Sequence, residues 1–254
     1  HVHFGATSQD VIDTALILRL RPMLAEFQRR IEAMVTALAN LDRRFGTNAI
    51  MGRTRMQDAL PIRAADRIAS WRGPLQRDLD RLAELSPRLL VLQFGGAVGT
   101  LDKLGDKAQA VAARLADGLD LRLPDHAWHN QRDGLVELAG WLSLVSGSLG
   151  KIGADVALMA QNSVNEIALD GTGGSSAMPH KANPVAAEVL VALARYNATL
   201  VGGMHGALVH EQERSGAAWT LEWLVLPQML MTTAAGLRTG LALAGQVTRL
   251  GRGG

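Results

Sequence analysis

The chain has 254 residues, which suffice for one large domain or two ordinary ones with a buried core. A formal net charge of +2 excludes a polycation that binds nucleic acid through bulk charge, and the absence of cysteine excludes disulfides and thiolate chemistry. The longest uncharged run, residues 223–237, is shorter than the ~20 residues of a membrane span, and no signal-peptide pattern is present. We therefore expect a soluble, cytoplasmic protein with no nucleic-acid or membrane partner.

Apolar residues recur at helical spacing through most of the chain. The first run covers residues 11–41, where Pro22 predicts a kink or a restart, and the second covers residues 62–85, with Gly73-Pro74 as an irregularity. Further helices are expected at residues 103–119, 133–169, 185–209 and 218–247. We find no alternating strand pattern and no internal repeat. The sequence predicts an all-α fold.

Several of these helices are long and carry apolar residues on more than one face. A helix of about 30 residues is about 45 Å long, which exceeds what a compact single domain of this mass needs. Small residues at Gly140, Ser146, Gly147 and Gly150 would let helix axes approach closely. We expect a bundle that continues into neighbouring subunits, and therefore a helical homo-oligomer.

Three polar, glycine-bearing segments interrupt the helices at residues 1–14, 51–62 and 171–185. Each has an ordinary structural interpretation. Residues 7–10, with the sequence TSQD, could cap a helix, because hydroxyls and carboxylates satisfy the free N–H groups at a helix start. Residues 171–185, GTGGSSAMPHKANPV, could form a linker, although Met, Pro, His and Lys are an unusual linker composition.

Together, the three segments are far more specific. Residues 174–184, GSSAMPHKANP, closely resemble the loop motif GSSxMPxKxNP of the fumarase/aspartase superfamily, and the other two segments resemble its remaining active-site regions in the same order. The resemblance implies a central bundle of long helices, a homotetramer whose active sites each combine three subunits, and addition or elimination next to a carboxylate. Members carry further N- and C-terminal regions, so residues 1–254 are expected to be the central helical-bundle domain with its active-site loops.

The resemblance assigns the catalytic chemistry to residues 174–184. Addition next to a carboxylate passes through an aci-carboxylate, whose extra negative charge needs fixed donors and cations. By resemblance, Lys181 and Asn183 bind that carboxylate and Ser175 is the catalytic serine, with its alkoxide stabilised by backbone N–H groups and Lys181. Ser176 is expected to have a supporting role. The glycines would let the loop close over the substrate.

The remaining site residues are also assigned by resemblance. Thr7, Ser8, Gln9, Thr54 and Gln57 are expected to bind a second substrate carboxylate. His3 either binds substrate or caps its segment. The substrate-binding candidates further along the chain are His129, Gln131 and Arg214. For Arg132 a buried structural role is favoured.

Arg55 departs from the pattern of many superfamily lyases, which have Thr-His where this chain has Thr54-Arg55. In those lyases the histidine exchanges protons at the leaving group, often paired with a glutamate at the position of Glu188 here. Arginine cannot exchange protons near neutral pH. Lactonisation needs no such proton, because its nucleophile is a carboxylate of the substrate itself. We therefore expect Arg55 to be a catalytic residue that binds substrate and is oriented by Glu188 across a subunit boundary.

The stretches TSQDVIDTALILRLR, WHNQRD and HEQERSGAAWTLEW resemble the bacterial 3-carboxy-cis,cis-muconate cycloisomerase family. This resemblance implies a tricarboxylate substrate held by Arg55, Lys181 and Arg214. Three alternatives stay open: a sulfonated relative of the muconate as the substrate, an adenylosuccinate lyase-like enzyme that releases fumarate, and a non-catalytic helical oligomer. Residues 95–100, GGAVGT, resemble a nucleotide-binding loop only superficially, because no strand precedes them. Histidine pairs without a third ligand give no metal site, so no metal and no cofactor is expected.

Overall fold

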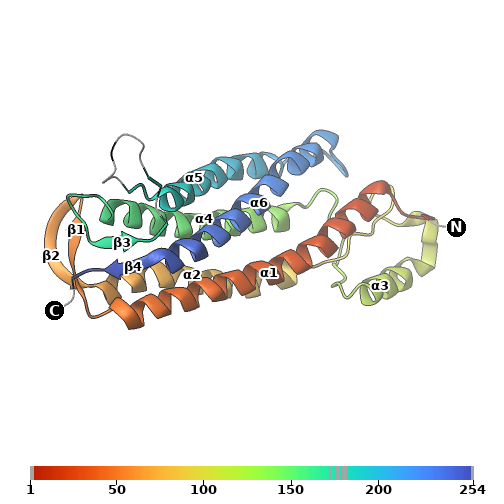
Figure 1. Cartoon of the computed structure of the whole chain (residues 1–254). Coiled ribbons are helices and arrows are strands. Elements are labelled where there is room, and N and C mark those ends of the chain that lie inside the picture. The colour runs from red at the N-terminus through yellow and green to blue at the C-terminus, as the bar shows by residue number, and fades with distance from the viewer. Residues whose placement is uncertain (1–2, 172, 175–177, 179–181, 253–254) are drawn as a thin grey trace. The chain divides into compact units, whose positions relative to one another are not determined.

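A computed structural model of the chain describes residues 3–171, 173–174, 178 and 182–252. Long helices dominate these residues, together with one 3₁₀ helix and four short strands (Figure 1). The helices are α1 (Ser8–Phe45), α2 (Ala64–Leu89), α3 (Ala108–Gly118), α4 (Asp133–Met159), α5 (Val185–Gly206) and α6 (Gly216–Gln246), and the 3₁₀ helix η1 is Asp102–Lys107. The all-α fold class is confirmed.

The chain divides into two compact units. The first unit comprises residues 1–26, 80–141 and 200–229, and the second comprises residues 27–79, 142–199 and 230–254. Helix α1 begins in the first unit and ends in the second, and α2, α4, α5 and α6 likewise contribute residues to both. The two units are described separately below.

Proline and glycine do not interrupt the first two helices as the sequence predicts. Helix α1 continues through Pro22, so the predicted restart is wrong. Leu20 and Leu24, on either side of it, are buried. Burial of flanking apolar residues offsets the lost hydrogen bond and the steric strain of an internal proline, which together cost about 3 kcal/mol. Helix α2 similarly runs through Gly73-Pro74 and ends at Leu89, beyond the predicted range of residues 62–85.

Small residues bring α4 and α5 close together in the second unit, as predicted for Gly150, whereas a Cβ atom added to Gly140 or Gly147 would meet no atom within 4 Å. A Cβ atom added to Gly150 would lie 2.5 Å from the Cβ atom of Ala194. One added to Gly153 would lie 2.4 Å from the carbonyl oxygen of Ala187. Because real Cβ atoms do not approach this closely, both glycines are needed for the packing of these helices.

Two antiparallel strand pairs were not predicted from the sequence. Strands β1 (Ala49–Thr54) and β2 (Gln57–Arg63) form a hairpin, and β3 (Ile167–Leu169) pairs with β4 (Val247–Leu250). Most side chains of β1 and β2 are exposed or half-buried, with Ile50 as the buried residue. A hairpin without a buried face has no apolar–polar alternation to reveal it.

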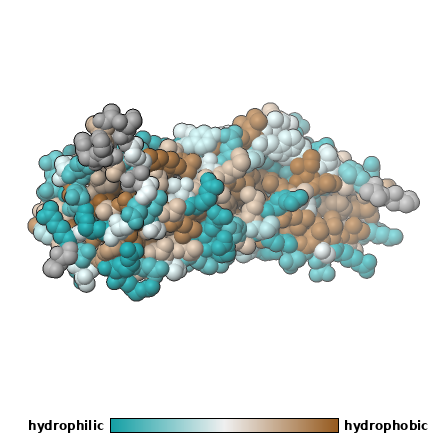
Figure 2. Space-filling view, viewed as in Figure 1, coloured by the Kyte–Doolittle hydropathy of each residue, from teal (hydrophilic) through white to brown (hydrophobic). Residues whose placement is uncertain are grey.

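Helices α5 and α6 leave large apolar side chains exposed. Figure 2 shows apolar side chains at the surface beside polar ones on the face in view. The exposed apolar residues of these two helices are Val185, Val189, Tyr196, Trp223, Leu224 and Met231. Helices α4 and α5 are long and apolar enough to cross a membrane by length and composition, with 50% and 17% of the relevant windows buried. A core or interface helix of a soluble protein meets the same two criteria.

Candidate active site

Asp10 organises the start of α1 in the first unit. Its carboxylate accepts hydrogen bonds of 2.9 Å from the backbone N–H groups of Thr7, Gly95 and Gly96. The Nε2 atom of His129 lies 2.7 Å from Asp10 Oδ1, and because an ionised carboxylate only accepts, this nitrogen donates. The Thr7 contact is one half of a capping box, so the capping interpretation of residues 7–10 is confirmed.

These donors keep Asp10 ionised. Burial alone would raise the pKa of the Asp10 carboxyl, but the hydrogen bond from His129 and those from the three backbone groups outweigh it and lower the pKa below its usual value. Gly96 approaches closely enough to donate because it has a φ of 70°, and a Cβ atom there would lie 2.7 Å from the Gly5 carbonyl oxygen. Residues 95–96 therefore hold a carboxylate of the protein itself.

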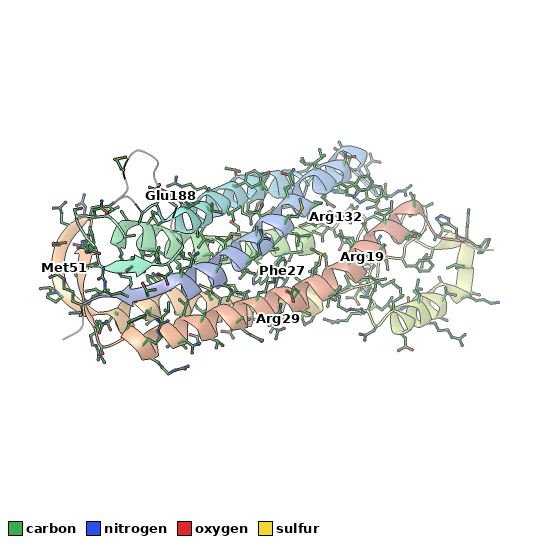
Figure 3. The ribbon with its side chains drawn as sticks, viewed as in Figure 1. Arg19, Phe27, Arg29, Met51, Arg132 and Glu188 are labelled. Carbon is green, nitrogen blue, oxygen red and sulfur yellow. The ribbon has the colours of Figure 1, made fainter. Side chains whose placement is uncertain are left out.

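Arg132 is the centre of a second buried network in this unit (Figure 3). Its Nη1 and Nη2 atoms donate to Asp13 over 2.6 and 3.1 Å, and its Nε and Nη2 atoms donate to Glu222 over 2.8 and 2.6 Å. The guanidinium carbon lies 4.7 Å from the Trp128 ring centroid, a cation–π contact. Burial would lower the pKa of Arg132, whereas the hydrogen bonds to Glu222 and Asp13 raise it above its ordinary value. The structural role favoured for Arg132 is confirmed.

His210 lies beside Glu222 at the edge of this network. Its Nε2 atom lies 3.4 Å from Glu222 Oε1 without hydrogen-bond geometry, and its side chain is fully buried. Burial lowers the pKa of His210, although the nearby Glu222 carboxylate acts in the opposite direction. We therefore describe His210 as a neutral, buried ring at neutral pH.

Of the site residues predicted in the first unit, some are used inside the fold and others remain at the surface. Gln9 is buried, and its side-chain amide donates to Asp13 over 3.1 Å and to the His129 carbonyl over 3.0 Å. Ser8, His3 and Arg214 are exposed, and the Arg214 guanidinium donates to the half-buried Thr7 hydroxyl. Thr7 and Arg214 are therefore brought together, whereas a ligand could reach the Nε2 atom of His129 only by displacing Asp10.

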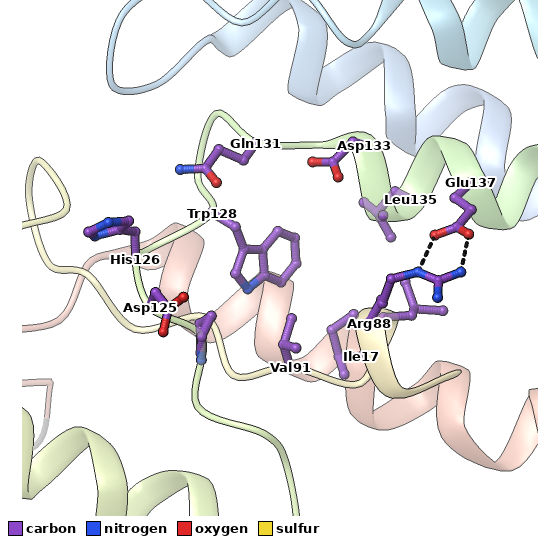
Figure 4. A pocket seen from close by; sticks show the side chains of 13 residues that line it. Ile17, Arg88, Val91, Asp125, His126, Trp128, Gln131, Asp133, Leu135 and Glu137 are labelled. Atoms are coloured by element: carbon purple, nitrogen blue, oxygen red, sulfur yellow. Dashed lines mark hydrogen bonds and ion pairs between the residues drawn. The ribbon is translucent and has the colours of Figure 1, made fainter. Parts of the chain in front are cut away.

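Gln131 lines a cavity of about 300 Å³ in the first unit (Figure 4). Gln131, Asp133 and Glu137 lie along one side of it, with Ile17 and Val91 across from them. The lining contains three carboxylates, those of Asp125, Asp133 and Glu137. Arg88 also lines the cavity and forms an ion pair with Glu137. Such a rim repels a tricarboxylate. The cavity does not favour the substrate-binding role expected for Gln131, which stays a prediction.

The predicted residues of the second unit include the tip of the β1–β2 hairpin. Thr54 pairs with Gln57 in the ladder, and Arg55 and Met56 form the two-residue turn between them. All four are exposed. Arg55 and Met56 line a cavity of about 560 Å³ together with Arg53, Arg67 and Lys151. The structure therefore brings Arg55 together with further cationic side chains that sequence reasoning missed.

Arg53 is fixed at the wall of this cavity. Its Nη1 atom lies 2.7 Å from Glu166 Oε2 and its Nε atom 2.8 Å from Asp58 Oδ1. The hydrogen bond to Glu166 is the main cause that raises the pKa of Arg53 above its ordinary value. Glu166 also accepts a 2.9 Å hydrogen bond from the Met51 backbone N–H. The Glu166 carboxylate therefore anchors strand β1 as well as Arg53.

The segment before α5 holds the remaining predicted residues. Gly173 and Asn183 exchange two backbone hydrogen bonds of 3.0 and 2.8 Å, which close the base of this segment. Glu188 is exposed in the first turn of α5 (Figure 3). Ser175, Ser176 and Lys181 lie outside the described residues. Pairing of Arg55 with Glu188 across a subunit boundary stays a prediction.

A metal or cofactor has no evident place in the part of the chain that the structure describes. Within that part, no group of three His, Asp or Glu side chains could hold a metal ion. The buried carboxylates of Asp10 and Asp13 already accept hydrogen bonds from donors of the protein.

Comparisons with known proteins give consistent results. A family model described as lyase matches residues 1–196. The chain is 46% identical over 246 residues to a 3-carboxy-cis,cis-muconate cycloisomerase of Pseudomonas aeruginosa, covering 96% of this chain and 54% of that protein. It therefore spans about half the length of the curated relatives it matches.

Two solved structures resemble the fold closely. A 3-carboxy-cis,cis-muconate lactonizing enzyme from Pseudomonas putida gives a TM-score of 0.92 at 41% identity, covering 98% of this chain and 56% of that chain. A fumarate lyase from Mesorhizobium sp. BNC1 gives a TM-score of 0.90 at 36% identity, with the same coverage of 98% and 56%. The muconate-converting relatives are thus similar both in sequence and in structure.

Proposed function

Because the chain belongs to the lyase family, we propose that it is the central part of a 3-carboxy-cis,cis-muconate cycloisomerase, which forms 4-carboxymuconolactone in protocatechuate degradation. The observation that carries this proposal is Arg55, which lines a cationic cavity where proton-exchanging lyases of the superfamily have a histidine. The sequence identity of 46% to a relative of that name supports the proposal that this chain acts on the same substrate. A small-molecule tricarboxylate fits a cationic cavity.

The proposed reaction is an intramolecular addition. One carboxylate of the substrate attacks the double bond conjugated to another carboxylate, so that a C–O bond forms and the π electrons move into an aci-carboxylate. Lys181 and Asn183 hold that developing charge. Ser175 then gives its proton to the α-carbon, and the serine alkoxide regains a proton from solvent. Arg55 binds substrate throughout and exchanges no proton.

A fumarate-releasing lyase is the second candidate, because one structural relative at 36% identity carries the name fumarate lyase. Its chemistry requires a proton at the departing group. Arg55 cannot supply that proton, and the sequence SGAA after Glu213-Arg214 lacks the histidine and serines that adenylosuccinate lyases use for a phosphate. A non-catalytic oligomer is the third candidate. Turnover of the muconate would exclude it, and absence of turnover would support it.

The test is loss of the conjugated-diene absorbance when the enzyme meets 3-carboxy-cis,cis-muconate. We expect lactone formation by the full-length protein without added metal or cofactor, unchanged by a chelator. Adenylosuccinate and argininosuccinate should not be cleaved, since each needs a leaving-group proton. The 254-residue chain should be assayed alongside, because it spans about half of its relatives. Efficient fumarate release from adenylosuccinate with the muconate untouched would contradict the proposal.

The proposal includes a homo-oligomer, a tetramer with shared active sites, in the cytoplasm. The apolar side chains of Val185 and Val189 stand exposed along α5 and need a partner surface. A second copy of the chain is the occupant we propose, because the superfamily resemblance implies sites built from several subunits. Helix α5 also carries Glu188 and Arg195, which suits a protein interface rather than a lipid bilayer.

Charge on this face should disrupt the assembly. Val189→Glu is expected to shift the molar mass from tetramer toward smaller species, because an interfacial carboxylate would be desolvated without a partner. Light scattering coupled to size-exclusion chromatography measures the mass. Arg114→Glu on the exposed face of α3 is the matched control and should leave the mass unchanged. A monomeric molar mass for the protein without substitutions would contradict the proposed oligomer.

A further inference from the structure

The cavity beside the hairpin tip is large enough for a small molecule and lies wholly within the second unit. Its volume of about 560 Å³ falls within the range of about 300–1,000 Å³ typical of ligand sites. The hairpin contributes Arg53, Arg55 and Met56, and α2 contributes Arg67. Lys151, Asp155 and Leu158 come from α4, and Gln161 and Val164 from the segment that follows.

Two of its four cations are already neutralised. Arg53 is paired with Glu166 and Asp58, at 2.7 and 2.8 Å. Lys151 is paired with Asp155, whose carboxylate also accepts a 2.7 Å hydrogen bond from Trp71 Nε1. These ion pairs hold the walls of the cavity in place. The unneutralised positive charge of the cavity is therefore that of Arg55 and Arg67.

Arg55 and Arg67 carry that free charge. Among the described residues, no carboxylate lies within ion-pair distance of either guanidinium, and the printed contact of Arg67 is a 3.5 Å approach of Nη1 to the Met159 sulfur. A thioether is a weak acceptor, so it does not satisfy a guanidinium. Two unpaired guanidiniums facing one cavity are suited to an anion with more than one carboxylate, which each can bind through its planar fork.

The backbone at the hairpin tip points to the same conclusion. Arg55 and Met56 have φ values of 50° and 67°, a conformation that two-residue turns normally fill with Asn-Gly. A residue with a Cβ atom is disfavoured there, and strain of this kind is concentrated at functional sites. Arg55 therefore does not suit the turn, and its position is explained by the cavity that it faces.

We propose that Arg67 is a substrate-binding, specificity-determining residue, which together with Arg55 binds carboxylates of a polycarboxylate substrate in this cavity. The inference rests on the proposed function and deepens it, because it adds Arg67 to the site and sets a minimum of two carboxylates. A substrate with one carboxylate fewer leaves a guanidinium unpaired, which lowers its affinity.

The experiment is calorimetric titration of the chain with propane-1,2,3-tricarboxylate, an unreactive tricarboxylate, at fixed ionic strength. Arg67→Gln should weaken binding by roughly 10- to 100-fold, the range expected for loss of a charge-assisted hydrogen-bond pair. Arg77→Gln is the matched control, since Arg77 is exposed on the same helix outside the cavity, and it should bind as the unchanged chain does. Met56→Gly should raise the urea midpoint by relieving strain at the hairpin tip.

The outcomes separate this inference from the proposed function. Equal binding by Arg67→Gln and the unchanged chain, or no measurable binding by either, overturns the inference even if the full-length enzyme forms lactone. Arg67-dependent binding without lactone formation supports the cavity as a polycarboxylate site and removes the muconate as its substrate. In the full-length enzyme, Arg67→Gln should raise KM more than it lowers kcat, whereas a defect in folding would reduce the active fraction and leave KM unchanged.

Discussion

Ser175→Ala in the full-length enzyme should lower turnover of the muconate by about 10²- to 10⁴-fold, the range typical of a general acid–base group. The hydroxyl of Ser175 is proposed to protonate the α-carbon after the ring closes, and alanine has no proton to give. KM should change little, because the substrate carboxylates are held by other side chains. Initial rates from diene absorbance measure the effect, and an unchanged unfolding midpoint shows that the fold is intact.

Ser176→Ala is the matched control, since it removes the neighbouring hydroxyl from the same glycine-rich segment. It should reduce turnover much less than Ser175→Ala. Both serines lie outside the described residues, but the backbone bonds between Gly173 and Asn183 show that the ends of their segment meet. Equal turnover by Ser175→Ala and the unchanged enzyme would remove Ser175 from the mechanism and leave the cationic cavity in place.

The helices could be predicted because their signal is local. The expected ranges of 185–209 and 218–247 correspond to α5 at Val185–Gly206 and α6 at Gly216–Gln246. The predicted restart at Pro22 was wrong because the energetic effect of a proline depends on the tertiary packing around it, which no local pattern contains. The β1–β2 hairpin escaped because its exposed side chains show no alternation. Its turn, Arg55-Met56, also lacks the Asn-Gly or Asp-Gly pair that normally reveals a two-residue hairpin turn.

Site residues could be predicted where they belong to a recognisable sequence motif. Thr7 and Arg214, which lie more than 200 residues apart, were both chosen from the sequence, and the structure brings them into contact. Arg67 was not chosen, because an arginine on an amphipathic helix is normally a solvated side chain and nothing in its spacing marks it. The capping role of Asp10 could be predicted from its spacing to Thr7, but its bonds to Gly95, Gly96 and His129 could not, because those residues lie 85, 86 and 119 positions away along the chain.

Arg132→Met should destabilise the chain by about 3–5 kcal/mol at neutral pH, the cost of breaking a buried ion pair by removing one partner. Arg132, Asp13 and Glu222 are all buried, and methionine fills much of the volume while supplying none of the four hydrogen bonds to the two carboxylates. Both carboxylates would then lie in the interior without a cation. Urea unfolding followed by circular dichroism measures the loss.

The cause of that loss is the missing cation and not missing volume, because methionine fills much of the space and leaves two buried carboxylates unpaired. Arg88→Met is the control, because its ion pair with Glu137 is exposed and its loss should leave the urea midpoint nearly unchanged. An unfolding midpoint of Arg132→Met equal to that of the unchanged chain at neutral pH would refute a stabilising role for the network.

If Arg132→Met does not fold, Arg132→Lys, which keeps the charge without the planar fork, should fold with a smaller but measurable loss of stability.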